Sequence, residues 1–155
     1  MDVARIAKNL NLRAPRRALL LDAPQAFDPM VTYLREVLGA AVDEAAAANV
    51  AYEYVHVFTR TVEQASMTLP VAVQALAGGG VFWVSYPKRA SKRYDTDLSR
   101  DGHGWAPLYE RDFEPVRQVS VDDDWSALRF RPVAEIGRMT RAFAMSEAGK
   151  RRTRS

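Results

Sequence analysis

The fold is decided by a short apolar run, Ala18-Leu19-Leu20-Leu21, which ends at the breakers Asp22-Ala23-Pro24. An apolar run of this length between chain breakers is typical of a buried central strand. Similar runs occupy residues 50–59 and 81–86, and helical patterns stand between the three runs. Strands that alternate with helices predict a mostly parallel sheet that is covered on both faces.

The last part of the pattern is different. Two strand patterns, residues 116–121 and 127–133, are joined only by Asp122-Asp123-Asp124. Such a short connection favours an antiparallel hairpin. We therefore predict an α/β fold: one Rossmann-like, methyltransferase-like three-layer sandwich, whose mostly parallel sheet is closed by a C-terminal antiparallel hairpin.

The expected domain covers residues 1–148, with a helical extension from about residue 134. Residues 149–155 form a basic tail that we expect to be disordered. The net charge of the chain is +3, and residues 135–155 alone contribute +4. The body of the domain is therefore close to neutral, and the positive charge is concentrated in the tail.

Composition excludes several classes of protein. The 155 residues include no cysteine and two histidines, His56 and His103. Disulfide frameworks, Cys-ligated zinc and thiol nucleophiles are thereby excluded, and we expect no metal site. The uncharged stretch 64–87 is broken by Gly78-Gly79-Gly80, so we expect no membrane span. With no secretory signal visible, we expect a cytoplasmic protein.

The helix expected after the strand run 50–59 has clear local signals at its start. Thr61 and Gln64 have the spacing of a capping box, which predicts a helix start. Pro70 should divide this helix into two pieces, and Gly78 should end it. The glycine triplet 78–80 then acts as a helix C-cap rather than a phosphate loop.

Four stretches resemble a known family. They are Leu19 to Pro24 with Phe27; Gly79 to Val84 with Tyr86-Pro87-Lys88 and Ala90-Ser91; Thr96-Asp97-Leu98 with Arg100-Asp101; and Val121-Asp122-Asp123 with Trp125-Ser126 and Leu128-Arg129-Phe130. The chain resembles a family of small bacterial proteins known only as a domain of unknown function. The resemblance implies the Rossmann-like fold and no reaction. In that family a plain helix follows the Asp97 motif, whereas here Gly102-His103-Gly104 interrupts it.

The turn after the first strand is a poor cradle for a nucleotide cofactor. Dinucleotide and S-adenosylmethionine sites need glycines there, so that the backbone can approach the ligand. Residues 22–27 contain no glycine, and Pro24 has no N–H to donate. Asp43-Glu44 lies where such folds place a ribose-binding acid, but we interpret it as a solvated loop. We expect no cofactor and assign no catalytic residue.

The loop after residue 86 is the best candidate site. It follows a central strand, and ligands of open α/β sheets bind outside the carboxyl ends of the strands. The anion-binding candidates are Lys88, Arg89, Ser91, Lys92, Thr96, Asp97 and Arg100. The alternative is a structural loop in which Lys88 or Arg89 holds Asp97.

The hairpin carries a second group of residues, Asp123, Trp125 and Arg129. Strand alternation places Trp125 and Arg129 on one face, with Ser126 on the other. Trp125 is expected to anchor the strand, and Arg129 to pair with an acid of the preceding turn. His56 is expected in the core and His103 at the surface.

The leading functional hypothesis is a non-enzymatic binding or regulatory domain with a degenerate cofactor site. A possible small anionic ligand would bind at the loop 87–101. The first alternative is an enzyme that acts on an anionic or phosphate-bearing substrate at the same loop. The second is weak nucleic-acid binding through the basic tail.

Overall fold

The computed structural model describes residues 1–136. Six strands form one sheet: β1 (Arg17–Leu21), β2 (Ala41–Asp43), β3 (Tyr52–Phe58), β4 (Leu76–Pro87), β5 (Phe113–Ser120) and β6 (Trp125–Pro132). The helices are α1 (Val3–Asn9), α2 (Asp28–Thr32), α3 (Val62–Ala75) and α4 (Ala106–Tyr109), with short turns η1 (Gln25–Phe27), η2 (Tyr33–Val37), η3 (His103–Trp105) and η4 (Val133–Glu135).

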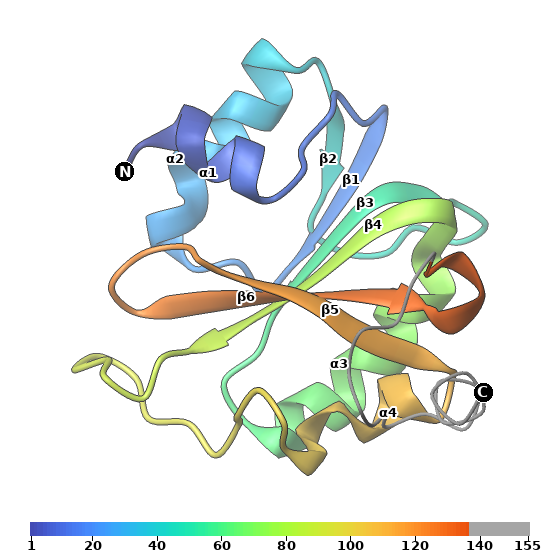
Figure 1. The fold of residues 1–155 in the computed structure, drawn as a ribbon. Coiled ribbons are helices and arrows are strands. Elements are labelled where there is room, and N and C mark those ends of the chain that lie inside the picture. The colour runs from blue at the N-terminus through green and yellow to red at the C-terminus, as the bar shows by residue number, and fades with distance from the viewer. Residues whose placement is uncertain (137–155) are drawn as a thin grey trace.

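The strand order is β2-β1-β3-β4-β6-β5. The first four strands run parallel to one another, and β6 pairs antiparallel with both β4 and β5. Helices α1 and α2 cover one face of the sheet, and α3 and α4 cover the other (Figure 1). The predicted α/β sandwich, with its closing antiparallel hairpin, is confirmed.

Each face of the sheet has its own apolar core. On the α1 and α2 side, Leu20, Phe58 and Trp83 pack together, and on the α3 and α4 side Leu19 and Phe82 do so. Neighbouring residues thus go to opposite faces, as strand geometry requires. The near-continuous apolar runs of β1 and β4 arise because both faces of these strands are covered.

The start of α3 was predicted correctly. The Thr61 hydroxyl accepts a hydrogen bond from the Gln64 backbone N–H at 3.0 Å, and the Gln64 side chain accepts one from the N–H of Arg60 at 2.8 Å. Two backbone donors at the helix N-terminus are thereby satisfied. This end of α3 lies beside the carboxyl ends of β1 and β3, where the candidate sites are found.

The prediction for Pro70 was wrong, because α3 is continuous from Val62 to Ala75. Proline removes one backbone hydrogen bond, but Leu69 and Ala72 remain fully buried against the sheet. Tertiary packing of that apolar face therefore outweighs the local cost of the proline.

The prediction for the glycine triplet was also wrong. The helix ends at Ala75, and Gly78-Gly79-Gly80 lies inside β4. Leu76 already pairs with Tyr52, and the glycines take up the extra length before Val81 pairs with Tyr54. Gly79 has φ +74°, and a Cβ on Gly80 would lie 2.9 Å from the Ala77 carbonyl oxygen. The triplet is thus a strand irregularity in which Gly79 and Gly80 occupy positions that favour glycine.

Two further boundaries differ from expectation. The helix that the family resemblance places after the Asp97 motif is short in this chain, because η3 and α4 together end at Tyr109. Gly104 packs against Leu98, whose Cδ2 would lie 2.4 Å from an added Cβ. The expected helical extension from about residue 134 and the basic tail lie outside the described residues, apart from η4. Within residues 1–136, no helix is long and apolar enough to cross a membrane.

Candidate functional site

β1 and β3 are neighbours in the sheet, but the chain passes from β1 to β2 on one side and from β3 to β4 on the other side. This is the topological switch point at which α/β sheets bind ligands. A cavity of 340 Å³ lies there, lined by Asp22, Ala23, Pro24, Phe58, Arg60, Gln64, Tyr94 and Trp125. The loop after β4 contributes Tyr94, and β6 contributes Trp125.

The charged groups of this switch-point cavity already have neighbours. Asp22 has φ +59°, and its carboxylate accepts a 3.5 Å hydrogen bond from the Gln64 side chain. The Arg60 guanidinium lies 5.3 Å from the centre of the Tyr94 ring, a cation–π distance. The rings of Tyr94 and Trp125 are 5.2 Å apart. The cavity is therefore a partly aromatic niche with one acid and one base.

These residues do not fit a dinucleotide or S-adenosylmethionine. The turn offers no glycine, and Pro24 precedes a 3₁₀ turn instead of opening a long helix onto the ligand. The Asp22 carboxylate lies where a pyrophosphate would need hydrogen-bond donors.

Asp43, the acid at the end of β2, does not fit the role of a ribose-binding acid either. The Asp43 carboxylate accepts a hydrogen bond from the hydroxyl of Tyr52, and the Tyr52 side chain is fully buried. The same hydroxyl accepts a 3.1 Å bond from the Ala47 N–H. Burial, followed by the hydrogen bond to Asp43, raises the pKa of Tyr52. Asp43 thus anchors the loop before β3, and the solvated loop expected at Asp43-Glu44 is tied to the core at Asp43.

The loop after β4 was predicted as one anion site, and the structure divides it into three parts. The first part brings Lys88, Arg89 and Arg100 together around a cavity of 240 Å³. The remaining lining residues are Tyr86, Leu98, Ser99, Gln118 and Ser126. We call this the basic cavity.

The polar groups of the basic cavity come from the sheet. Tyr86 and Ser126 are paired across β4 and β6, and both are buried. The Gln118 amide donates a 3.3 Å hydrogen bond to the Tyr86 hydroxyl, and Lys88 Nζ donates one to Ser120 at 2.6 Å. Burial, the largest effect, raises the pKa of Tyr86. Tyr86 therefore keeps its proton at neutral pH and can act as a donor.

The second part contains Ser91 and Lys92, which meet Asp123 of the hairpin turn. They line a shallow hollow of 590 Å³ with Ala90, Arg93 and Asp124. The Ser91 hydroxyl donates a 2.7 Å hydrogen bond to Asp124 and accepts bonds from the N–H groups of Arg93 and Tyr94. Ser91 therefore organises the loop, and two acids balance the two bases of this hollow.

The third part contains Thr96 and Asp97, which bind the start of α3. Asp97 accepts a 2.9 Å hydrogen bond from the N–H of Val62, and Thr96 donates one of 2.8 Å to the carbonyl of Arg60. The alternative in which Lys88 or Arg89 holds Asp97 was wrong, because the described residues show no such ion pair. The loop folds back over α3, so the carboxylate meets free backbone donors of the helix instead.

The three candidate residues of the hairpin also lie in different places. Trp125 is 3% exposed and packs in the core on the α1 side, as expected. Asp123 is exposed at the turn. Arg129 was expected to pair with an acid of that turn, and this was wrong: its Nε is buried and has no hydrogen-bond partner among the described residues. The reason is register, since Arg129 lies opposite Arg117 and away from the turn.

His56 and His103 are placed as expected, in the core and at the surface. His56 lies between the hydroxyls of Tyr54 and Ser85, at 2.9 Å from Nδ1 and 2.6 Å from Nε2. Burial lowers the pKa of His56 to about 3, so the ring is neutral. With all three side chains buried, we interpret this chain of hydrogen bonds as structural.

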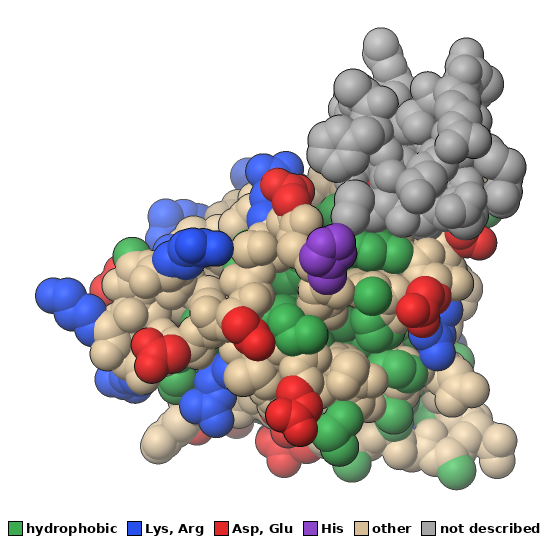
Figure 2. Space-filling model, turned by 90° about the horizontal axis from the view of Figure 1, so that it is seen from below, with side chains coloured by type: hydrophobic (Ala, Val, Ile, Leu, Met, Phe, Trp, Pro, Cys, Tyr) green, Lys and Arg blue, Asp and Glu red, His purple; other side chains and the backbone are tan. Residues whose placement is uncertain are grey.

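Sequence reasoning missed Tyr86, Gln118 and Ser126 as cavity residues. They lie on three strand ends that only the sheet register brings together. The sequence did contain one signal for them, because all three are polar although they lie within strand patterns. The surface that carries the loop and α4 shows acidic and basic side chains interspersed, with hydrophobic side chains between them (Figure 2).

No protein-family model and no curated protein sequence matches this chain. Among solved structures, the ribosomal protein L11 methylase of Lactobacillus delbrueckii subsp. bulgaricus is similar at 9% identity and TM-score 0.48, over 84% of this chain and 76% of that chain. The magnesium protoporphyrin IX methyltransferase of Synechocystis PCC 6803, with bound SAM, is 14% identical at TM-score 0.44, over 83% and 74%. Likenesses this distant do not bear on the activity of this chain.

Proposed function

We propose that this protein is a binding domain for a small anionic ligand, held in the basic cavity at the carboxyl end of β4. The observation that carries the proposal is the charge of the cavity lining. Three basic side chains, Lys88, Arg89 and Arg100, line it together with no acidic one. The switch-point cavity and the hollow at Ser91 both include acids.

The size and chemistry of the basic cavity support a compact anion. Its 240 Å³ is below the range of about 300–1,000 Å³ that is typical of sites for drug-sized ligands. Guanidinium groups match the geometry of phosphate and carboxylate oxygens, and an ammonium adds a point charge. The protonated Tyr86 hydroxyl and the Gln118 amide offer neutral donors beside them.

Binding rather than catalysis is supported by the same residues. A nucleophilic mechanism needs a base within hydrogen-bond reach of the nucleophile. Ser126 and Ser99 line the cavity without a histidine or carboxylate in that lining. The Tyr86 hydroxyl has a raised pKa and is not a base at neutral pH.

The test is anion binding at low ionic strength, measured by two-dimensional NMR on the full chain with inorganic phosphate and then pyrophosphate. We expect saturable shifts of the backbone N–H signals of Gln118 and Ser126. The double variant Lys88→Ala with Arg89→Ala should weaken this binding at least about tenfold, equivalent to about 1.4 kcal/mol. Its matched control is Lys92→Ala with Arg93→Ala, which removes the same charge from the neighbouring hollow and should bind as the parent does.

Two results would overturn the proposal. One is an absence of saturable shifts at Gln118 and Ser126 up to millimolar anion. The other is equal weakening in both double variants, since this would show that general charge and not the basic cavity attracts the anion.

A further inference from the structure

Four arginines gather on the face of the hairpin opposite to the basic cavity. Arg117 of β5 lies directly opposite Arg129 of β6, and Arg131 follows two residues later on the same face. Arg13 joins them from the segment between α1 and β1. We call Arg13, Arg117, Arg129 and Arg131 the arginine face.

The charges of the arginine face act on one another. Burial lowers the pKa of Arg129 most, and the positive charges of Arg131, Arg117 and Arg13 lower it further. The side chain is half-buried, and its Nε is a buried donor without a partner among the described residues. Like charges directly opposite in a ladder are destabilising, and so is a buried unpaired donor. An anion bound there would relieve both costs.

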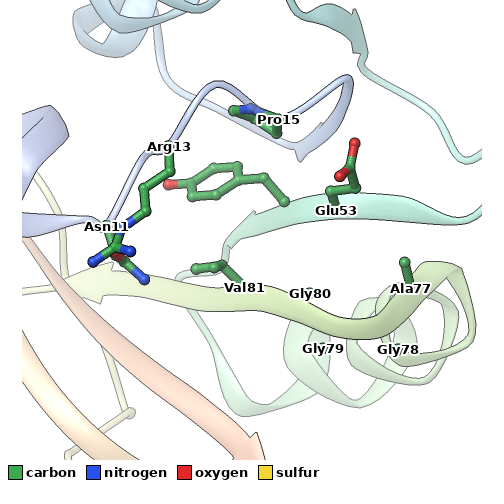
Figure 3. Close-up of a pocket in the computed structure, with 10 residues that line it drawn as sticks. Asn11, Arg13, Pro15, Glu53, Ala77, Gly78, Gly79, Gly80 and Val81 are labelled. Carbon is green, nitrogen blue, oxygen red and sulfur yellow. The ribbon is translucent and has the colours of Figure 1, made fainter.

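Arg13 is held in place by a strained segment. Ala14 has φ +40°, which is rare for alanine, and Asn11 has φ +55°, a left-handed value that asparagine adopts more readily than most residues. The Asn11 side chain accepts a 3.0 Å hydrogen bond from Arg13 Nε. Both side chains lie at one end of a 180 Å³ cavity that the glycine stretch of β4 lines at its other end (Figure 3). Backbone strain that orients a charged side chain is typical of binding sites.

One acid faces the four arginines. Glu114 lies opposite Arg131 in the ladder and is fully buried. Glu53 lines the 180 Å³ cavity at the end away from Arg13 (Figure 3), where its carboxylate accepts a 2.7 Å hydrogen bond from the N–H of Arg16. Residues 1–136 as a whole contain 16 basic and 18 acidic side chains, so the positive charge here is a local segregation.

We propose that the arginine face binds a small ligand that carries two or more phosphate groups. Planar guanidinium forks bind phosphate oxygens in pairs, and this gives geometric selectivity as well as attraction. Arg117 and Arg129 are adjacent across the ladder, and Arg131 is one strand repeat away, so the site is compact. A nucleic-acid interface would instead need a long basic surface, which the net acidic body does not offer.

The experiment uses the full chain with pyrophosphate and tripolyphosphate as probes, and calorimetry and melting temperature as readouts. The test variant is Arg117→Gln with Arg131→Gln. The matched control is Arg35→Gln with Arg111→Gln, which removes the same charge at exposed sites where the arginines bind only backbone carbonyls. We expect the test variant to bind tripolyphosphate at least about tenfold more weakly than the control. Without ligand, Arg117→Gln alone should melt no lower than the parent, because it removes one member of the like-charge pair Arg117 and Arg129.

A second variant, Arg129→Lys, keeps the charge but removes the fork and the buried Nε. It should also lose affinity, and this loss separates guanidinium recognition from attraction by charge. Equal binding in the test and control variants would overturn the proposal. So would a single-stranded oligonucleotide that competes for the same site more tightly than tripolyphosphate. Because Lys88→Ala with Arg89→Ala leaves this face intact, failure here is distinguishable from failure of the basic cavity.

Discussion

The carboxylate of Asp97 accepts a hydrogen bond from the backbone N–H of Val62, the first residue of α3, at 2.9 Å. One acid thus fixes the end of the long loop after β4 to the N-terminus of the helix that follows β3. An acid at this position also complements the positive end of the helix dipole. The loop therefore has a fixed anchor beside the basic cavity, and the cavity walls depend on that anchor.

Removal of the anchor should destabilise the fold. We expect Asp97→Ala to cost about 0.5–2 kcal/mol in urea unfolding, as for other lost helix caps. Asp97→Asn should cost less, because an amide oxygen can still accept the bond. Lys88→Ala with Arg89→Ala should change stability by less than about 1 kcal/mol, since neither side chain holds Asp97. A larger loss in that double variant would contradict the observed geometry.

The glycine triplet provides a matched pair of substitutions. An added Cβ at Gly80 would lie 2.8 Å from Leu76 Cδ1 and 2.9 Å from the Ala77 carbonyl oxygen, whereas one at Gly78 would meet nothing within 4 Å. We expect Gly80→Ala to cost about 1–3 kcal/mol, as overpacking does. Gly78→Ala should be neutral or stabilising by about 0.4–1 kcal/mol, because alanine lowers the conformational entropy of the unfolded chain. Thermal melts of the two variants check this, and similar melting temperatures would refute the strand irregularity.

His56 should make stability depend on pH. Its folded pKa is lowered from 6.5 to about 3 by burial, so the unfolded chain binds a proton first as the pH falls. The contribution of His56 to the free energy of unfolding is therefore constant above pH 6.5. It declines as the pH falls from 6.5 to 3, by up to about 1.4 kcal/mol per pH unit. Urea midpoints at pH 7, 6 and 5 should fall less in His56→Gln than in the parent. His103→Gln, at the exposed histidine, should keep the parent's pH profile, and a parent profile in His56→Gln would exclude this origin.

The switch point should not bind nucleotide cofactors tightly. The turn at residues 22–24 offers neither glycine nor an N–H at Pro24 to either cofactor, and the Asp22 carboxylate would also repel the pyrophosphate of NAD. Calorimetry with S-adenosylmethionine and with NAD should give no affinity better than about millimolar. Micromolar binding of either compound would disprove this interpretation and would restore an enzyme of that class as the leading hypothesis.

The elements that could be predicted from the sequence are those with local causes. The Thr61 and Gln64 pair starts α3 because both bonds form within one turn. The alternation in β6 assigns Trp125 and Leu128 to opposite faces because strand geometry has a period of two. Continuous apolar runs predict central strands because both faces of such strands are covered. Their alternation with helices predicts the α/β class.

The rest depended on contacts between distant segments. Pro70 stays helical because the sheet packs against its neighbours, and Asp97 caps α3 because the loop folds back over that helix. The arginine face was missed as a unit because Arg117 meets Arg129 only through the register of the hairpin, and Arg13 joins them from a distant segment. The alternating pair Arg129 and Arg131 was the available signal, since two arginines on one face of a strand predict a shared surface.

Strand β4 extends from Leu76 to Pro87, so a single element runs from the glycine-lined cavity beside Arg13 to the basic cavity beside Tyr86. It is hydrogen-bonded to β3 and to β6 along its central part and cannot slide between them without breaking both ladders. The two proposed anion sites are therefore held at a constant separation by a rigid spacer. Occupancy of one site should leave the affinity of the other unchanged, so the protein is expected to take up two anions additively, as two independent receptors on one sheet.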